Sequence, residues 1–302
     1  MFISVGVVII DDIILPDGRS HMAQLGGGGV HAVMGMRAWS ESVGLLAPVG
    51  EDFPPALRQQ LAGRFDLSGI VVRAGHRTPR AWQIFETDGT RHEIFRTDPA
   101  EMVAMMLRPE EFPQKFRQLN GVHLHCAPQE VPLWAPFLRQ CGDPVILWEP
   151  WDPFCAPEHR AEFRQFAPLV DVVSPNLLEA RTLTGLQEPD AVADAMLADG
   201  ARLAVIRMGE RGSLLAAADG RRVCLPAYAA GPIVDVTGAG NAYCGGLIVG
   251  LARGGDLALA GSMATVSASL ALEQFGAVYP VEDVLERSAR RLDDYQHTAR
   301  GQ

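Results

Sequence analysis

The sequence contains a single lysine, Lys115, among its 26 basic residues. This scarcity argues against Schiff-base chemistry, and the chain has no Gly-Lys-Ser/Thr step, which a Walker-type phosphate loop requires. Cys-x-x-Cys pairs are also missing, and the five cysteines are scattered, as is typical of free thiols rather than a zinc site or a disulfide framework. A cationic group that assists phosphate binding must therefore be an arginine or a metal ion, and backbone amides can contribute as well.

Long hydrophobic runs and basic runs are missing too. The longest run of apolar and small residues, Ala242 to Ala252, is far shorter than the roughly 18 residues that a membrane-spanning helix needs. The net charge is −10, so neither nucleic acid nor an anionic membrane is expected as a partner. The N-terminus shows no export-signal pattern, which predicts a cytoplasmic location.

What the sequence does contain is the pattern of an α/β protein. Met1 to Ile10 is an almost continuous apolar run, which predicts one strand buried on both faces of a parallel sheet and ending at Asp11-Asp12. Further strand-like segments alternate with helix-like ones, at Val122–Cys126, Val145–Trp148, Val170–Val173 and Leu203–Met208. Such alternation indicates a doubly wound, mainly parallel sheet. Polar residues, Glu149 and Asp152 among them, follow these strands.

The stretch from Asp235 to Asn241 stands out as a candidate ligand site. An extended apolar approach leads into the small residues Gly238, Ala239 and Gly240, and a small-residue helix follows. Small residues let the backbone approach a ligand closely. The first amides of a helix lack intrahelical partners and carry partial positive charge, so this turn predicts an anion site, most often for phosphate.

This stretch resembles the C-terminal signature of the ribokinase-type (PfkB) family of carbohydrate and nucleoside kinases, Asp-x-x-Gly-Ala-Gly-Asp. Asp235, Gly238, Ala239 and Gly240 match it, and Asn241 stands where the family has its last Asp. In the family the glycine turn forms the anion hole and the last Asp is the general base. The segments around Trp148-Glu149-Pro150 are similar to a divergent branch, the fungal maintenance-of-killer-type proteins and their bacterial relatives.

The resemblance implies an α/β fold, with a ribokinase-like, three-layer, doubly wound and mainly parallel sheet and a small β lid. The whole chain, residues 1–302, is then a single domain, with the lid formed by segments at about 12–25 and 78–97. Residues 80–97 alternate in polarity, and Asp88-Gly89 forms a predicted hairpin turn within them. Because exposed lid strands need covering, a homodimer through the lid is expected.

On the acceptor side, the family's first signature is a double glycine that opens a helix and lines the sugar site. Gly26 and Gly27 match it, and His31 stands where the family usually has Asn. An Asp shortly after the first strand binds sugar hydroxyls in the family, and Asp12 matches it by its spacing from Gly6. Histidine can still bond a hydroxyl, and it can titrate near neutrality.

On the nucleotide side, Asn176-Leu177-Leu178-Glu179 resembles the family's Asn-x-x-Glu motif, which organises Mg²⁺ near the phosphates of ATP. The resemblance therefore makes Glu179 the expected metal residue and Asn176 a nucleotide-side residue.

The segment Arg207 to Ser213 resembles the Gly-x-x-Gly turn that flanks ATP, with Gly209 and Gly212 as its glycines and Arg207 able to reach the phosphates. Asp235 and Thr237 are expected beside the nucleotide. In many relatives a monovalent cation binds in this region, so the resemblance allows a K⁺ site near Asp235, Thr237 and Gly276.

Asn241 leaves three functions open. The first is an ATP-dependent kinase of a sugar, nucleoside or related polyol, slowed because an amide is not a usable base, or using another carboxylate, for which Asp12 is the first candidate. The second is a catalytically inactive relative that binds nucleotide or sugar and acts through a partner. The third is a different reaction on the same scaffold. An Asn introduced deliberately in place of Asp is a further explanation that one sequence leaves open.

Overall fold

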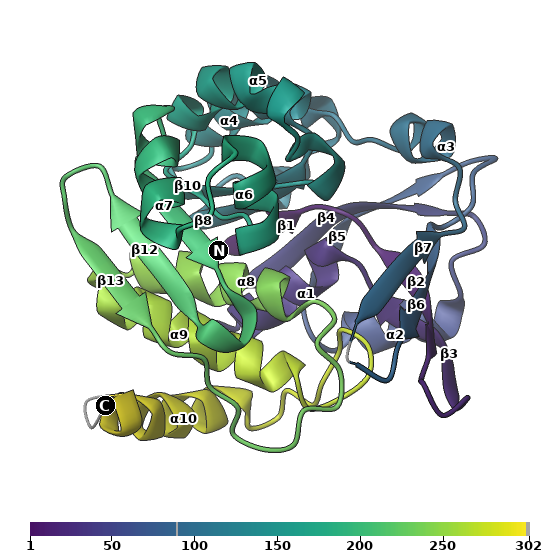
Figure 1. Cartoon of the computed structure of the whole chain (residues 1–302). Coiled ribbons are helices and arrows are strands. Elements are labelled where there is room, and N and C mark those ends of the chain that lie inside the picture. Colours follow the sequence, from purple (N-terminus) through teal and green to yellow (C-terminus); the bar gives the residue numbers. More distant parts are fainter. Residues whose placement is uncertain (89, 300–302) are drawn as a thin grey trace.

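The computed structural model describes residues 1–88 and 90–299 (Figure 1). Its centre is a nine-stranded sheet with the order β13-β12-β11-β10-β9-β8-β1-β4-β5. The strands from β11 to β5 pair in parallel, and β12 and β13 are added antiparallel at one edge. The strands of this sheet are β1 Phe2–Val5, β4 Val43–Gly50, β5 Asp66–Arg73, β8 Gly121–Cys126, β9 Val145–Pro150, β10 Val172–Val173, β11 Leu203–Arg207, β12 Ser213–Ala217 and β13 Arg222–Leu225.

Helices cover both faces of this sheet, so apolar side chains form one core on each side. In Figure 1, α4 to α7 lie on one side, and α1, α8, α9 and α10 lie on the other. The predicted doubly wound α/β architecture is thus confirmed. The helices are α1 Gly28–Arg37, α2 Pro55–Ala62, α3 Pro99–Ala104, α4 Val131–Arg139, α5 Arg160–Phe166, α6 Leu177–Thr184, α7 Pro189–Ala198, α8 Ala239–Ala252, α9 Leu257–Ala271 and α10 Val284–Ala299. Among the described residues, none of these helices combines the length and apolar character that crossing a membrane requires.

A second, four-stranded sheet with the order β3-β2-β6-β7 stands beside the large one (Figure 1). Its strands β2 and β6 pair in parallel, and β3 and β7 flank them antiparallel. Gly89, one residue of the predicted turn between β6 and β7, lies outside the described residues. We call this sheet the lid; its strands are β2 Ile9–Ile14, β3 Ser20–Gly26, β6 Arg80–Phe85 and β7 Arg91–Phe95.

The prediction of one strand over Met1 to Ile10 is wrong. The run divides at Gly6 into β1, which lies in the large sheet, and β2, which lies in the lid. Both halves are buried, so hydrophobicity alone does not reveal the break. At the break, a Cβ on Gly6 would lie 3.0 Å from Cα of Gly29, which shows how closely the chain passes the start of α1. As a result, Asp11 and Asp12 lie inside a lid strand and not at the end of a core strand.

Helices α1 and α8 cross at backbone contact. A Cβ on Gly35 of α1 would overlap the carbonyl group of Ala242, and a Cβ on Gly245 of α8 would overlap the carbonyl oxygen of Ala32. The two helices therefore approach as closely as glycine permits, and each glycine is required by the other helix.

We predict that Gly35→Ala destabilises the protein by at least about 1 kcal/mol, because overpacking costs typically 1–3 kcal/mol and here the obstacle is backbone. Urea unfolding measures this. Gly63→Ala is the matched control, since a Cβ there meets no atom within 4 Å and the φ of Gly63 is −80°. If Gly35→Ala were as stable as Gly63→Ala, the backbone contact between α1 and α8 would be contradicted.

Candidate active site

Two helix N-termini meet at the edge of the large sheet. Helix α8 starts after Gly238, which has a left-handed φ of 73°, and no side chain caps it. Helix α1 starts after Gly27, with φ 93°, and is likewise without a side-chain cap. Residues 237–241 are only half-buried, so a ligand can reach the start of α8. There the Ala239 amide donates to the Val236 carbonyl over 3.3 Å, and the amides of Gly240 and Asn241 have no partner among the described residues. The predicted turn at Gly238, Ala239 and Gly240 therefore has the geometry of an anion site.

His31 lies directly beneath this turn. A Cβ on Gly238 would overlap the His31 ring, so glycine is required there both for its φ and for space. Both ring nitrogens of His31 are buried without a hydrogen-bond partner among the described residues. Burial lowers the pKa of His31 to about 4, and Arg91 contributes to the same shift. The ring is therefore neutral at physiological pH and does not titrate near neutrality.

Asn241 faces a buried carboxylate. Its Nδ2 donates to Glu149 Oε2 over 2.9 Å, and His123 Nε2 lies 2.7 Å from the same oxygen. The other oxygen, Oε1, is 2.7 Å from Nη2 of Arg207, which also donates to the carbonyl of Ser174. Burial would raise the pKa of Glu149, but Arg207 and His123 outweigh it and hold the pKa well below its usual range. Glu149 is thus an ionised group beside Asn241, with a partner on each of its two oxygens.

Arg207 connects this network to the anion site. A Cβ on Gly240 would overlap Nη1 of Arg207, and the Nε of Arg207 is buried without a partner among the described residues. The guanidinium therefore lies against the start of α8 and retains donors that its ion pair with Glu149 does not use. Such a group suits a phosphate, which accepts several hydrogen bonds at once.

Asn176 and Glu179 form a closed capping box at the start of α6. Glu179 Oε2 accepts from the Asn176 backbone amide at 2.7 Å, and Asn176 Oδ1 accepts from the Glu179 amide at 2.9 Å. Nη2 of Arg207 lies 3.8 Å from Glu179. Burial raises the pKa of Glu179 to about 7. A carboxylate with so high a pKa is one that a bound cation would stabilise, which fits the hard oxygen donors that Mg²⁺ prefers.

Two oxygens before α8 are also unsatisfied. Asp235 uses Oδ1 to accept from the Thr237 amide at 2.8 Å, whereas its Oδ2 and the Thr237 hydroxyl are buried without partners among the described residues. Buried polar atoms seldom stay unpaired, so these oxygens fit a cation or a ligand donor. Gly276, the third residue expected near a K⁺ site, has φ 76° and lies against Leu25 and Gln24.

The turn after β11 has a backbone that only glycine accommodates. Gly209 has φ 60°, and Gly212 has φ 82° and would overlap the Leu225 carbonyl if it carried a Cβ. An isolated bridge joins Arg207 to Asn176, so this turn and the start of α6 lie side by side. The nucleotide-side residues predicted from the sequence are thereby brought to one edge of the sheet.

In the lid, Asp11 rather than Asp12 lies against the glycine-rich turn. A Cβ on Gly26 would overlap the Asp11 carboxylate, and burial, assisted by Glu93, raises the pKa of Asp11 to about 7. Asp12 is engaged elsewhere, because it accepts from Ala23 N at 2.8 Å and from Arg96 Nη1 at 2.7 Å. Neighbouring strand residues face opposite sides, so only one of the pair can look towards the site.

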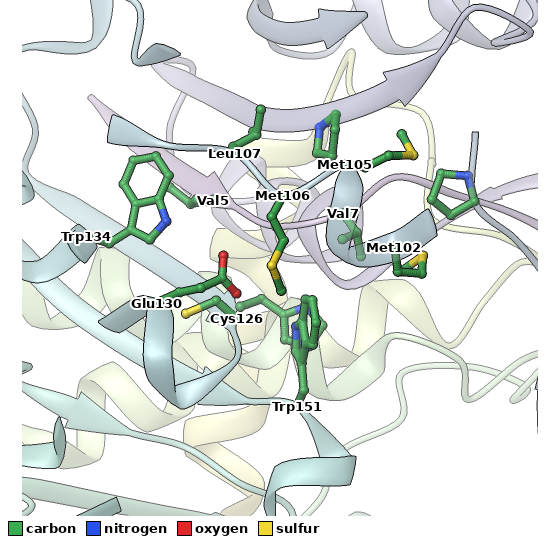
Figure 2. Close-up of a pocket in the computed structure, with 14 residues that line it drawn as sticks. Val5, Val7, Met102, Met105, Met106, Leu107, Cys126, Glu130, Trp134 and Trp151 are labelled. Atoms are coloured by element: carbon green, nitrogen blue, oxygen red, sulfur yellow. The ribbon is translucent and has the colours of Figure 1, made fainter. Parts of the chain in front are cut away.

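Figure 2 shows a pocket with a mostly apolar lining. Met102, Met105 and Met106 line it from the segment around α3, and Trp151 lines it from the end of β9. His125 also lines it; a Cβ on Gly28 would lie 2.5 Å from His125 Nδ1 and 2.9 Å from Asn241 Nδ2, so only Gly28 separates pocket and network.

Polar atoms without partners face this apolar lining. His125 Nδ1 and Trp151 Nε1 are both buried and lack a hydrogen-bond partner among the described residues. Burial raises the pKa of Glu130, another lining residue, to about 7. The cavity has a volume of about 30 Å³, so it holds a water molecule or two, and an organic ligand would enter only if the lining side chains moved.

His123, Glu149 and Cys244 have ligand atoms within 4.8 Å of one another. Both nitrogens of His123 are already engaged, by Ser4 Oγ at 2.9 Å and by Glu149, and Arg207 neutralises Glu149. A metal ion would have to displace the guanidinium, so we interpret the cluster as an ion-pair network. His125 stacks on His123 with ring centroids 5.9 Å apart, in agreement with packing rather than metal binding.

Comparison with known proteins identifies the scaffold. A model of the pfkB family of carbohydrate kinases matches residues 4–284. The chain belongs to this family. It is 31% identical over 259 residues to the cytidine kinase of Thermococcus kodakarensis, a match that covers 84% of this chain and 89% of that kinase.

Two further similar proteins inform the fold and the place of this chain within the family. The chain is 26% identical over 314 residues to Protein MAK32 of Saccharomyces cerevisiae, covering 91% of this chain and 85% of that protein, which confirms the predicted resemblance to the fungal branch. An E. coli protein described as a ribokinase II, solved with ATP and Mg²⁺, superposes with a TM-score of 0.75 at 18% identity, over 96% of this chain and 99% of that one.

Sequence reasoning missed some residues of this pfkB-type site. In the sequence, Glu149 stands out only as a polar residue at a strand end. Asp11 enters only as the neighbour of Asp12. Position at the carboxyl end of a parallel strand is the available signal for Glu149 and Trp151, since ligands bind at that edge in open α/β sheets.

We predict opposite effects on stability at pH 8 when each of the two adjacent aspartates of the lid is replaced by asparagine. Because the folded pKa of Asp11 is raised to about 7, the native state holds an extra proton, and stability falls as pH rises from about 4 to about 7, by at most about 1.4 kcal/mol per pH unit. Asp11→Asn should remove this loss and unfold at a higher urea concentration than the parent at pH 8. Asp12→Asn, the control, should be destabilised at pH 5 and at pH 8, because the amide keeps one oxygen for either Ala23 N or Arg96 and the other donor loses its acceptor. If Asp11→Asn and Asp12→Asn changed the stability at pH 8 in the same direction and by the same amount, the raised pKa of Asp11 would be contradicted.

Proposed function

We propose that this protein transfers the γ-phosphoryl group of ATP to a hydroxyl of a nucleoside or a related sugar or polyol. The observation that carries the proposal is the uncapped start of α8 at Gly238 to Gly240 with the guanidinium of Arg207 against it. Membership of the pfkB family supports ATP as the donor. Walker-type phosphate loops bind phosphate with a lysine, and this chain has no such loop. In its place, backbone amides and an arginine would bind the phosphate.

The amides of Gly238, Ala239 and Gly240 and the Arg207 guanidinium would bind the transferring phosphoryl group and stabilise the charge that develops on it. The turn with Gly209 and Gly212, beside Asn176, would flank the nucleotide. Both roles extend the family resemblance. The Gly240 amide is a donor without a partner among the described residues, whereas the Ala239 amide would have to exchange its contact with the Val236 carbonyl for one with phosphate.

Glu179, with its raised pKa, would hold Mg²⁺ through water, and the metal would neutralise phosphate charge. The unpaired Asp235 Oδ2 and Thr237 hydroxyl would hold K⁺ or orient the nucleotide side. Both ions are supported by the chemistry of these donors.

The acceptor would lie between the lid and the glycine-rich turn of Gly26 and Gly27, with Asp11 bonding its hydroxyls and His31 below. We favour a nucleoside over a free sugar, because this chain is 31% identical to a cytidine kinase. The apolar pocket beside the site has a volume of about 30 Å³, so a base would fit there only if the lining Met and Trp side chains moved.

Turnover would be slow, since an amide at position 241 does not accept a proton at neutral pH, and loss of a general base costs about 10²–10⁴-fold. Phosphoryl transfer still depends mainly on positioning and electrostatics. The alternative is a protein that binds ligands without turnover and acts through a partner. One observation favours it: the carboxylate nearest to Asn241 is already fully paired, with Arg207, His123 and Asn241 itself.

The experiment is calorimetric titration with ATP and Mg²⁺, followed by a screen for ADP release with nucleosides and, separately, with free sugars. We expect binding of ATP and slow turnover with a nucleoside. Gly240→Val should abolish nucleotide binding, because its side chain would occupy the space of the Arg207 guanidinium, and Gly63→Ala should leave binding unchanged. Binding without turnover on any acceptor would support the alternative, and absence of ATP binding would contradict both.

A homodimer through the lid belongs to the same proposal. Strand β7 is the edge of the lid sheet, and all its residues are exposed, Ile94 and Phe95 among them at 45% and 49%. An exposed apolar edge strand needs a cover. We predict a dimer in sedimentation velocity, and a monomer after Ile94→Lys. A parent protein that sediments as a monomer at tens of micromolar would contradict the prediction.

A further inference from the structure

The amide of Asn241 has a defined orientation, because its partner is a carboxylate. An ionised carboxylate can only accept hydrogen bonds, so the Nδ2 side of the amide must face Glu149. The Oδ1 side must then face away from the buried network. Asn241 is half-buried at the start of α8, next to the amides of the anion site, so its oxygen is the side of the amide that the buried network leaves available.

Glu149 is held in place from three sides. His123 and Asn241 contact one oxygen, and Arg207 contacts the other, so the carboxylate cannot rotate without breaking at least one of these contacts. His123 is itself fixed by Ser4, at 2.9 Å. Glu149 is 4% exposed, so water does not replace these partners. The orientation of the Asn241 amide is therefore determined by a rigid, buried anchor.

The same contacts explain why position 241 carries an amide. A carboxylate there would stand about 2.9 Å from that of Glu149, in a buried site with a single nearby guanidinium. Two carboxylates at this distance do not both ionise. Asn241 is therefore matched to Glu149, and the pair retains one negative charge that sits on residue 149 instead of residue 241.

We propose that Glu149 is the positioning residue of this active site: the carboxylate that the family carries at position 241 has been exchanged for an amide, and Glu149 directs the oxygen of that amide to the acceptor hydroxyl. This inference rests on the proposed kinase function. The hydroxyl donates to Asn241 Oδ1, and its oxygen attacks the γ-phosphorus. The new O–P bond forms as the bond between the γ-phosphorus and the bridging oxygen of ADP breaks, and the hydroxyl proton leaves to bulk water.

The test is an exchange of carboxylate and amide between the two positions, in four proteins: the parent, Asn241→Asp, Glu149→Gln and the double variant. The double variant has the charge of the parent and keeps a 149–241 hydrogen bond with reversed direction. Turnover, KM and thermal midpoint are measured for each with the acceptor found in the screen. Circular dichroism confirms that each variant is folded.

We expect Asn241→Asp alone to lower kcat at least tenfold and to lower the thermal midpoint, because it places two carboxylates together. The double variant should be at least tenfold more active than Asn241→Asp, since the carboxylate at position 241 then stands free of a like charge. Glu149→Gln should lower kcat with little change in KM for ATP, because the amide loses its orientation while the phosphate site remains.

A gain of tenfold or more in Asn241→Asp alone would overturn the proposal, since it would mean that only the base is missing. A folded double variant no more active than Asn241→Asp would also overturn it. If the parent and all variants bind ATP but none turns over, the kinase function fails and the catalytic role of Glu149 fails with it. The thermal midpoints then still decide whether the two residues are coupled, because uncoupled changes would add.

Discussion

The site depends on the contact of two helix backbones. Gly35 and Gly245 let α1 and α8 cross without intervening side chains, and this crossing brings the N-termini of both helices to one edge of the sheet. Gly28 and Gly238 then stand close to His125 and His31, with no room for a Cβ. The positive ends of two helices are thereby combined, and the buried carboxylate of Glu149 lies where their field favours negative charge.

Much of the fold follows from the sequence. The strands Gly121–Cys126, Val145–Pro150 and Leu203–Arg207 lie where apolar residues predict them, because parallel strands buried on both faces are rich in apolar residues, even though His123, His125 and Glu149 interrupt two of them. The first strand was misjudged for the same reason. Since β1 and β2 are both buried, no polar residue of the run from Met1 to Ile10 marks the passage from one sheet to the other, because Ser4, its single polar residue, lies inside β1.

The sequence predicts the backbone motifs of the candidate site, but it does not predict which charged and polar side chains pair there. The glycine turn at Gly238 and the capping box of Asn176 and Glu179 are local patterns, so a sequence reveals them. Glu149 and Asn241 are 92 residues apart, and nothing in either local sequence indicates that they meet. The choice between Asp11 and Asp12 likewise depends on which face of β2 is turned to Gly26, and this is decided by tertiary pairing.

The contact between Glu149 and Asn241 also makes the effect of a substitution at either position depend on the residue at the other. With Glu149 in place, an aspartate at position 241 would have to share a proton with it, because two carboxylates about 2.9 Å apart do not both ionise. With glutamine at position 149, the same aspartate would be free of a like charge. A substitution that looks like the loss of one group is thus one half of a coupled pair.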